Sequence, residues 1–187
     1  MSHNARCLYE NSFSSFLLDT EMSVLGTLHD NVHGDTRSTA TEAWKEEIAI
    51  MRNAVAECST DGRIIFEYDI PRLGKRIDVV LLVNGIIFCI EFKVGESRIL
   101  EADIDQVLDY ALDLKYFHRF SQDKIIVPIL AATNYPRASS LVQKSIYDDK
   151  VVNPLVAGKA DLSGMIQSTL ARFPDETPIS PDWTISP

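Results

Sequence analysis

The stretch that decides the fold is KRIDVVLLVNGIIFCIEFK, residues 75–93. Two runs rich in branched and aromatic apolar residues, 76–83 and 86–93, flank the pair Asn84-Gly85. Runs of this composition are typical of β-strands. An Asn-Gly pair favours a two-residue type I′ turn, because both of its positions need positive φ. The stretch therefore predicts a β-hairpin.

The pairing in this hairpin brings charged residues together at its open end. If Val83 opposes Ile86 beside the turn, the same register sets Asp78 opposite Glu91. Both strands are otherwise apolar on both faces, which is typical of strands inside a sheet. Two carboxylates side by side in such a place destabilise the fold, and a divalent cation between them removes that cost. Carboxylate oxygens suit Mg²⁺ or Mn²⁺, so Asp78 and Glu91 are predicted metal ligands.

Lys93 lies two residues after Glu91 and therefore projects from the same face. A lysine beside a metal site can stabilise the charge that develops on a phosphate. The alternative is that Asp78, Glu91 and Lys93 are strand-end residues in water, with Lys93 as a salt-bridge partner. A β-bulge that shifts the register would remove the geometric argument for a site.

The composition excludes several classes of protein. The 187 residues suit one domain, and 45% hydrophobic with 24% charged residues is a globular composition. No apolar run reaches the roughly 18 residues that a membrane span needs, and the N-terminus has no apolar signal core. The three cysteines form no CxxC motif. These observations predict a cytoplasmic protein with free thiols and no membrane partner.

The charge is distributed unevenly. A net charge of −9 argues against a general nucleic-acid coat, because affinity for phosphates comes largely from Lys and Arg. Residues 63–98, however, carry 6 basic and 5 acidic residues, so a contact with phosphate is expected there. The candidates are Arg72, Lys75 and Arg76, with a solvated strand start as the alternative. In the hairpin register Arg76 would oppose Lys93, which is unfavourable unless an anion lies between them.

The remaining pattern predicts the order of elements and four segments. A helical apolar stripe follows Thr39, and residues 100–119 return to the helical period. The predicted order is helix, three strands, helix and strand, within a core at residues 39–135. The other segments are an N-terminal helical arm (1–38), a C-terminal extension with a helix (136–173) and a Pro-rich linker (174–187). Such a linker is expected to lead to a further domain.

Asp78, followed after twelve residues by Glu91-Phe92-Lys93, resembles the D…(D/E)-x-K signature of the PD-(D/E)XK nuclease superfamily. Ile77 stands where the full signature has proline. The predicted element order is similar to the αβββαβ core of that superfamily. The resemblance implies a restriction-endonuclease-like α/β fold, with a mixed central sheet flanked by helices, and metal-dependent hydrolysis of phosphodiester bonds. It also implies that the Phe92 carbonyl assists Asp78 and Glu91 at the metal.

Three further residues fit this superfamily. Gln106 and Tyr110 resemble the Q-x-x-x-Y motif of exonucleases related to the RecBCD recombination nuclease, and their spacing places them on one helix face. The resemblance gives them roles in orienting the attacking water or the DNA. The superfamily also has an acidic residue on its first helix, for which Glu47 is the candidate beside the buried stripe. The alternatives are a core Tyr110, an ordinary helical Gln106 and a solvated Glu47.

A longer resemblance covers nearly the whole chain. Segments YDIPRLGKRIDVV, IEFKVGE, DQVLDYALDLKYFH and IIVPILAAT resemble the N-terminal nuclease-like module of bacterial DNA/RNA-helicase-like proteins. This resemblance implies that the substrate is nucleic acid, with DNA preferred over RNA as the expectation. It also implies a C-terminal helicase or ATPase domain as a partner, although the given sequence contains no GxxxxGK[ST] motif. The alternatives are a catalytically silent nuclease-fold module that binds nucleic acid or a partner, and a toxin or defence effector.

Overall fold

The computed structural model describes residues 6–32, 37–70, 73–136, 149–173 and 177–185. Its elements in chain order are β1 (Tyr9–Ser12), α1 (Phe13–Leu18), α2 (Glu21–Asn31), α3 (Arg37–Ala56), β2 (Arg63–Asp69), β3 (Arg76–Val83), β4 (Ile86–Lys93), α4 (Glu101–Phe117), η1 (Arg119–Ser121), β5 (Ile125–Ala132), β6 (Leu155–Ala157), α5 (Leu162–Arg172) and η2 (Trp183–Ile185). The predicted order of helix, three strands, helix and strand is confirmed as α3-β2-β3-β4-α4-β5.

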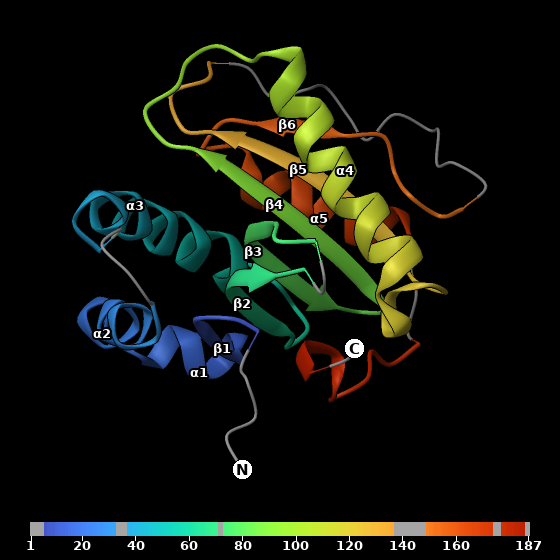
Figure 1. The fold of residues 1–187 in the computed structure, drawn as a ribbon, viewed down its shortest axis with the longest axis horizontal. Helices are drawn as coiled ribbons and strands as arrows, with labels where there is room; N and C mark the ends of the chain where they lie inside the picture. Colours follow the sequence, from blue (N-terminus) through green and yellow to red (C-terminus); the bar gives the residue numbers. More distant parts are fainter. Residues whose placement is uncertain (1–5, 33–36, 71–72, 137–148, 174–176, 186–187) are drawn as a thin grey trace.

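The strands form one six-stranded sheet in the order β1-β2-β3-β4-β5-β6 (Figure 1). Neighbours from β1 to β4 are antiparallel, whereas β5 and β6 add parallel to β4 and β5. The helix α4 forms the crossover between β4 and β5 that a parallel connection needs. The protein is therefore an α/β protein with a mixed sheet flanked by helices, as predicted.

The central hairpin has the predicted turn. Asn84 and Gly85 both have positive φ, 48° and 74°, as a type I′ turn requires. Pairing runs in the predicted register from Val83–Ile86 beside the turn to Val79–Ile90. No further β3–β4 pair forms among the described residues, so Asp78 and Glu91 come directly after the last rung of the ladder.

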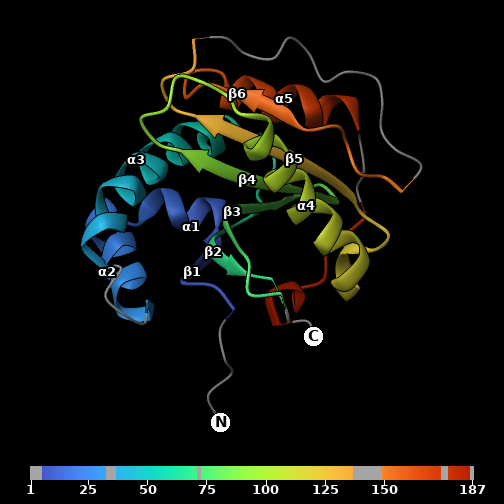
Figure 2. The same cartoon turned by 45° about the horizontal axis from the view of Figure 1, so that its top comes forward.

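Each face of the sheet has its own core. We call the two faces the α3 face, which α1, α2, α3 and α5 cover, and the α4 face, which α4 and the C-terminal segment cover (Figure 2). Strand residues in the core of the α3 face include Ile64, Phe66, Val79, Leu81, Phe88 and Ile90. Strand residues in the core of the α4 face include Ile65, Val80, Leu82, Ile87 and Cys89. A sheet covered on both faces explains why its strands are apolar on both sides.

Both ends of the chain join this sheet more closely than the sequence patterns indicate. The segment predicted as a helical arm also supplies β1, which pairs with β2 at the edge of the sheet. In the segment predicted as a linker, Trp183 is fully buried in the core of the α4 face. Arg63 donates to the carbonyl oxygens of Ser180 and Pro181 at 2.7 and 2.9 Å, which ties this segment to β2.

Candidate metal and catalytic site

The sheet is distorted at the open end of the hairpin. The β2–β3 ladder passes from Phe66–Val79 to Tyr68–Ile77 and skips Glu67 and Asp78, which lie between these pairs. Glu67 has φ 56°, a conformation that costs an L-residue roughly 1–2 kcal/mol. Beyond this break the alternation of side chains is reversed, because Tyr68 and Ile77 pack on the α4 face. The break releases the Glu67 and Asp78 side chains from regular strand positions.

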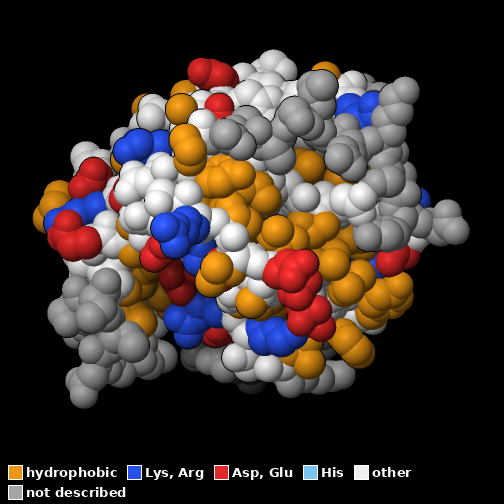
Figure 3. Space-filling model, turned by 90° about the horizontal axis from the view of Figure 1, so that it is seen from above, with side chains coloured by type: hydrophobic (Ala, Val, Ile, Leu, Met, Phe, Trp, Pro, Cys, Tyr) orange, Lys and Arg blue, Asp and Glu red, His pale blue; other side chains and the backbone are white. Residues whose placement is uncertain are grey.

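Four carboxyl groups gather at this break: Glu47 from α3, Glu67 from β2, Asp78 from β3 and Glu91 from β4. We call them the acid cluster. Glu47 and Glu91 are only 5% and 6% exposed, and each has a buried Oε2 atom without a hydrogen-bond partner in the described part of the chain. Figure 3 looks onto this end of the molecule and shows acidic side chains set back between lysine and arginine side chains.

Two members of the cluster are fixed by β4 and α4. Asp78 Oδ2 accepts a hydrogen bond from the Phe92 backbone N–H at 2.7 Å, in place of a strand rung. Glu91 Oε1 accepts from Lys93 Nζ and from Gln106 Nε2, both at 3.0 Å. The structure therefore brings together Asp78, Glu91 and Lys93, although the two acids do not form a ladder pair.

Helix α4 completes this network. Gln106 Oε1 accepts from Lys93 Nζ at 3.1 Å, and Gln106 Nε2 also contacts the Tyr110 hydroxyl at 2.6 Å. Asp103, one turn before Gln106, lies 3.5 Å from Lys93 Nζ. Gln106 and Tyr110 thus lie at the site and hold the Glu91–Lys93 pair. Tyr110 also packs in the core of the α4 face, so its two interpretations are compatible.

Burial changes the acidity of the cluster. It raises the pKa of Glu47 to about 8, and the charges of Glu67 and Glu91 act in the same direction. Burial, followed by the charges of Glu91 and Glu47, raises the pKa of Asp78 well above its ordinary value. Burial also raises the pKa of Glu91, although Lys93 opposes the shift. At neutral pH Glu47 therefore retains a proton that an ordinary carboxyl group has released.

The residues suit a divalent cation, but their side chains are not arranged around one. Within the described residues, no three or more His, Cys, Asp or Glu side chains are placed so that they could hold a metal ion as they stand. Asp78, Glu67 and Glu91 each point an oxygen at a donor, namely Phe92 N–H, Trp44 Nε1 and Lys93 Nζ. The buried, unpartnered oxygens of Glu47 and Glu91 nevertheless have the chemistry of Mg²⁺ or Mn²⁺ ligands.

The basic residues predicted to contact phosphate have acidic partners. The Arg76 guanidinium contacts Glu67 at 3.2 Å and Asp69 at 2.9 Å, both on β2. The prediction that Arg76 opposes Lys93 is wrong, because the β3–β4 pairing extends only from Val83 back to Val79 and does not reach Arg76. Lys75 Nζ lies 2.8 Å from Asp113 on α4. Arg72 lies outside the described residues.

The sequence reasoning missed three residues at the site. Asp103 has a signal, since it precedes Gln106 by one helical turn and shares its face. Glu67 has none, because nothing in the sequence indicates a non-glycine residue with positive φ inside a strand. Trp44 belongs to the apolar stripe that follows Thr39 and is 2% exposed, but its Nε1 also donates to Glu67 Oε1 at 2.7 Å, which an apolar stripe does not indicate.

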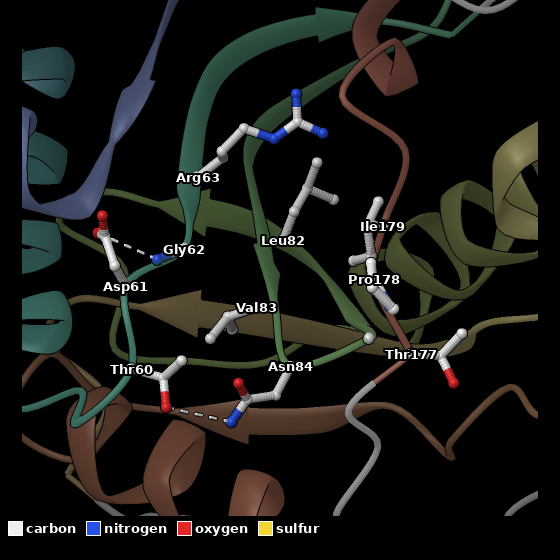
Figure 4. Close-up of a pocket in the computed structure, with 11 residues that line it drawn as sticks. Thr60, Asp61, Gly62, Arg63, Leu82, Val83, Asn84, Thr177, Pro178 and Ile179 are labelled. Carbon is white, nitrogen blue, oxygen red and sulfur yellow. Dashed lines mark hydrogen bonds between the residues drawn. The ribbon is translucent and has the colours of Figure 1, made fainter.

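A separate pocket lies at the opposite end of β3. Its volume is ≈ 460 Å³, and its walls come from the Thr60–Arg63 segment, the hairpin turn and Thr177–Ile179 (Figure 4). None of the predicted site residues lines it. The acid cluster and this pocket are therefore independent features of the fold.

Comparison of the chain with models of protein families, with curated proteins and with solved structures gives no match. In the part of the chain that the structure describes, no helix is long and apolar enough to cross a membrane. The function must therefore be argued from the site itself.

Proposed function

We propose that this chain is a metal-dependent nuclease that hydrolyses phosphodiester bonds of nucleic acid. The observation that carries the proposal is a pair of buried carboxylate oxygens, from Glu47 and Glu91 beside Asp78, that have no hydrogen-bond partner in the described part of the chain. Buried polar atoms in folded proteins almost always have partners, so unpartnered ones need a reason. A divalent cation supplies one, since it would satisfy these oxygens and neutralise the repulsion between the acids.

A restriction-endonuclease-like core is part of the same proposal. Its support is the element order α3-β2-β3-β4-α4-β5, with three antiparallel strands followed by a helix and a parallel strand. In this arrangement Asp78 comes from the second strand of the core, Glu91 and Lys93 come from the third, and Gln106 comes from the following helix. Each residue of the D…(D/E)-x-K resemblance is thus at the same end of the sheet.

The roles of the residues follow from their contacts. Asp78, Glu91 and the Phe92 carbonyl would hold Mg²⁺ or Mn²⁺, with Glu47 as an additional acidic ligand. When bound, the cation would lower the pKa of the attacking water and neutralise phosphate charge. Lys93 would stabilise charge on the phosphate. Burial acts to lower the pKa of the Lys93 ammonium group, but the neighbouring charge of Glu91 keeps that pKa above its ordinary value. Gln106 would orient Lys93 and Glu91, and Tyr110 would orient Gln106.

The distribution of charge along the chain bears on the substrate. Residues 63–98, which include Lys75, Arg76 and Lys93, carry 6 basic and 5 acidic residues in a chain of net charge −9. This stretch is where a phosphate backbone would meet the least repulsion. We propose DNA as the substrate and a C-terminal helicase or ATPase domain as a partner, as the resemblance implies.

A cleavage assay with matched variants tests the nuclease. Wild type is incubated with single- and double-stranded DNA and RNA in Mg²⁺, Mn²⁺ or EDTA. Asp78→Asn keeps an oxygen for the Phe92 N–H but removes the charge, and Lys93→Ala removes the ammonium group; both are expected to abolish metal-dependent cleavage. Glu101→Gln, an exposed residue at the start of α4, is the charge-matched control and should cleave normally. Cleavage retained in both site variants would overturn the proposal.

A non-catalytic module that binds nucleic acid or a partner is the second candidate. One observation favours it: the Lys93 ammonium already contacts Glu91, Gln106 and Asp103, so it is not free for a phosphate. Calorimetric titration with Mn²⁺ separates the candidates. Binding in wild type that is lost in Asp78→Asn supports the nuclease. The absence of binding up to millimolar Mn²⁺, together with retained affinity for nucleic acid, supports the silent module.

A further inference from the structure

Two of the three nitrogen atoms of the Arg76 guanidinium group contact carboxylates. Its Nε atom contacts Asp69 at 2.9 Å and its Nη1 atom contacts Glu67 at 3.2 Å. Within the described residues no hydrogen bond reaches its Nη2 atom, and the side chain is 43% exposed. Two carboxylates therefore fix the plane of the guanidinium group and leave its third nitrogen without a hydrogen bond among the described residues. A guanidinium fixed in this way is suited to bind a phosphate oxygen.

The contact between Arg76 and Glu67 depends on an unusual backbone conformation. Alternation along β2 would place Glu67 with Ile65 on the α4 face, but its φ of 56° turns the side chain toward α3. There Trp44 Nε1 donates to Glu67 Oε1 at 2.7 Å, while Glu67 Oε2 faces Arg76. Both oxygens of this strained residue therefore have assigned donors.

An ordinary surface ion pair needs none of these features. A pair between exposed side chains stabilises a fold by at most a small amount, and it requires neither backbone strain nor a tryptophan N–H. Glu67 moreover brings its charge toward three other carboxyl groups, which raises the pKa of Glu47 and destabilises the metal-free fold. Strained conformations of this kind concentrate at functional sites, where the strain serves to position a group.

We propose that Glu67 is a positioning residue that orients the Arg76 guanidinium toward a substrate phosphate, and that Trp44 fixes Glu67 in this role. The inference rests on the proposed function, because it needs nucleic acid as the ligand. Through these contacts, α3, which carries Glu47, and β3, which carries Asp78, would keep a fixed position relative to the phosphate backbone of the bound nucleic acid.

Binding of a labelled DNA oligonucleotide in EDTA tests the inference without any contribution from cleavage. Fluorescence anisotropy gives the affinity and its salt dependence. Removal of a negative charge near a phosphate should by itself tighten binding, whereas loss of positioning should weaken it. We therefore expect Arg76→Gln to weaken binding about tenfold and Glu67→Gln about threefold to fivefold, with a salt dependence reduced by about one ion for Arg76→Gln.

A double variant distinguishes positioning from a general effect on the fold. If Glu67 acts through Arg76, then Glu67→Gln has no further effect once Arg76→Gln is present. Trp44→Phe, which keeps an aromatic ring but removes the N–H, should weaken binding in the same direction and should also have no effect in the Arg76→Gln background. Circular dichroism confirms that each variant is folded. If Glu67→Gln does not fold, Trp44→Phe alone carries the test.

Glu10→Gln is the matched control. Glu10 forms a comparable cross-strand pair with Arg63 at 2.9 Å, but at the other end of β2, beside the pocket in Figure 4. It should bind like wild type or slightly more tightly. If wild type binds nucleic acid and Glu67→Gln binds equally well or better, the inference is wrong and the proposed function stands. If wild type binds no nucleic acid, the proposed function fails and the inference fails with it.

Discussion

The acid cluster and the C-terminal segment are two buried polar regions, and they differ in whether their polar atoms have hydrogen-bond partners. In the second region, His118 Nδ1 lies 2.7 Å from Ser121 Oγ, His118 Nε2 lies 2.9 Å from the Trp183 carbonyl, and Trp183 Nε1 donates to Ser121 Oγ at 2.9 Å. We call these three residues the clasp. Every polar side-chain atom of the clasp has a partner, whereas Glu47 and Glu91 each keep a buried oxygen that no described residue contacts with a hydrogen bond.

The two regions also differ in how burial shifts the pKa values of their ionisable groups. Burial lowers the pKa of His118 to about 4, so at neutral pH the clasp contains an uncharged ring that fits its partners. Burial raises the pKa of Glu47 to about 8, and its acidic neighbours add to that shift. The clasp is therefore complete without a ligand, and it stabilises the fold. The acid cluster destabilises the fold until protons or a cation compensate its charge.

The largest effect is expected from the clasp. Trp183→Ala removes a fully buried indole that packs on Tyr68 and His118, so it should lower the free energy of unfolding by about 3–5 kcal/mol. Urea denaturation measures this loss. Ile185→Ala in the same segment is the control and should change stability by less than about 0.5 kcal/mol, since Ile185 is half-exposed. A loss below about 1 kcal/mol for Trp183→Ala would show that the segment contributes little.

The second effect is the response of the clasp to acid. Between pH 6.5 and 4 the unfolded chain binds a proton on His118 that the folded protein excludes, so stability should fall as the pH falls through this window. The loss attributable to His118 is as much as about 3 kcal/mol. Denaturation curves of wild type and His118→Asn give it by difference. Parallel stability profiles for the two proteins would contradict the assignment.

The third effect concerns the acid cluster and a divalent ion. If the cluster binds Mn²⁺, an ion concentration of one hundred times its dissociation constant stabilises the folded protein by about 2.7 kcal/mol. Thermal denaturation with and without Mn²⁺ measures the gain. His118→Asn should retain it, because the clasp is not involved, and Asp78→Asn should lose it. An equal gain in Asp78→Asn would mean that the ion binds elsewhere.

The fourth effect is the pH dependence of the metal-free cluster. Because the folded pKa of Glu47 lies above its unfolded value, its contribution to stability is complete below pH 4.5 and is lost as the pH rises through about 8. In EDTA, the stability of Glu47→Gln relative to wild type should therefore rise between pH 5 and pH 9, by as much as about 5 kcal/mol for a pKa near 8. Glu46→Gln, its less buried neighbour, should show no such change. An equal effect of Glu47→Gln at both pH values would refute the explanation.

The sequence predicts local elements well because their signals lie within a few residues. The Asn84-Gly85 turn, the strands on both sides of it and the helical period after Leu100 all appear as predicted. The edge strand β1 is only four residues long and its pattern is ambiguous, so it was missed. Trp183 was missed because its partners, His118 and Ser121, lie more than sixty residues earlier in the chain.

The sequence predicts which acids come together at the candidate site, but it does not predict the backbone break through which they meet. The hairpin register does bring Asp78 and Glu91 to the same end of the sheet. They meet, however, through a break in the ladder, where Asp78 accepts from the Phe92 N–H, and not as a regular pair. That break depends on the backbone of Glu67 and on Trp44 from α3, and contacts between separate elements leave no periodic signal in the sequence.

The N-terminal strand and the C-terminal turn meet at one edge of the sheet. Thr184 Oγ1 donates to Glu10 Oε2 at 2.9 Å, and Arg63 of the neighbouring strand binds both Glu10 and the Pro181 carbonyl. Figure 1 shows the first and last described elements, β1 and the turn Trp183–Ile185, on the side away from the carboxyl end of β4. A short peptide that joins the two ends should thus permit circular permutation.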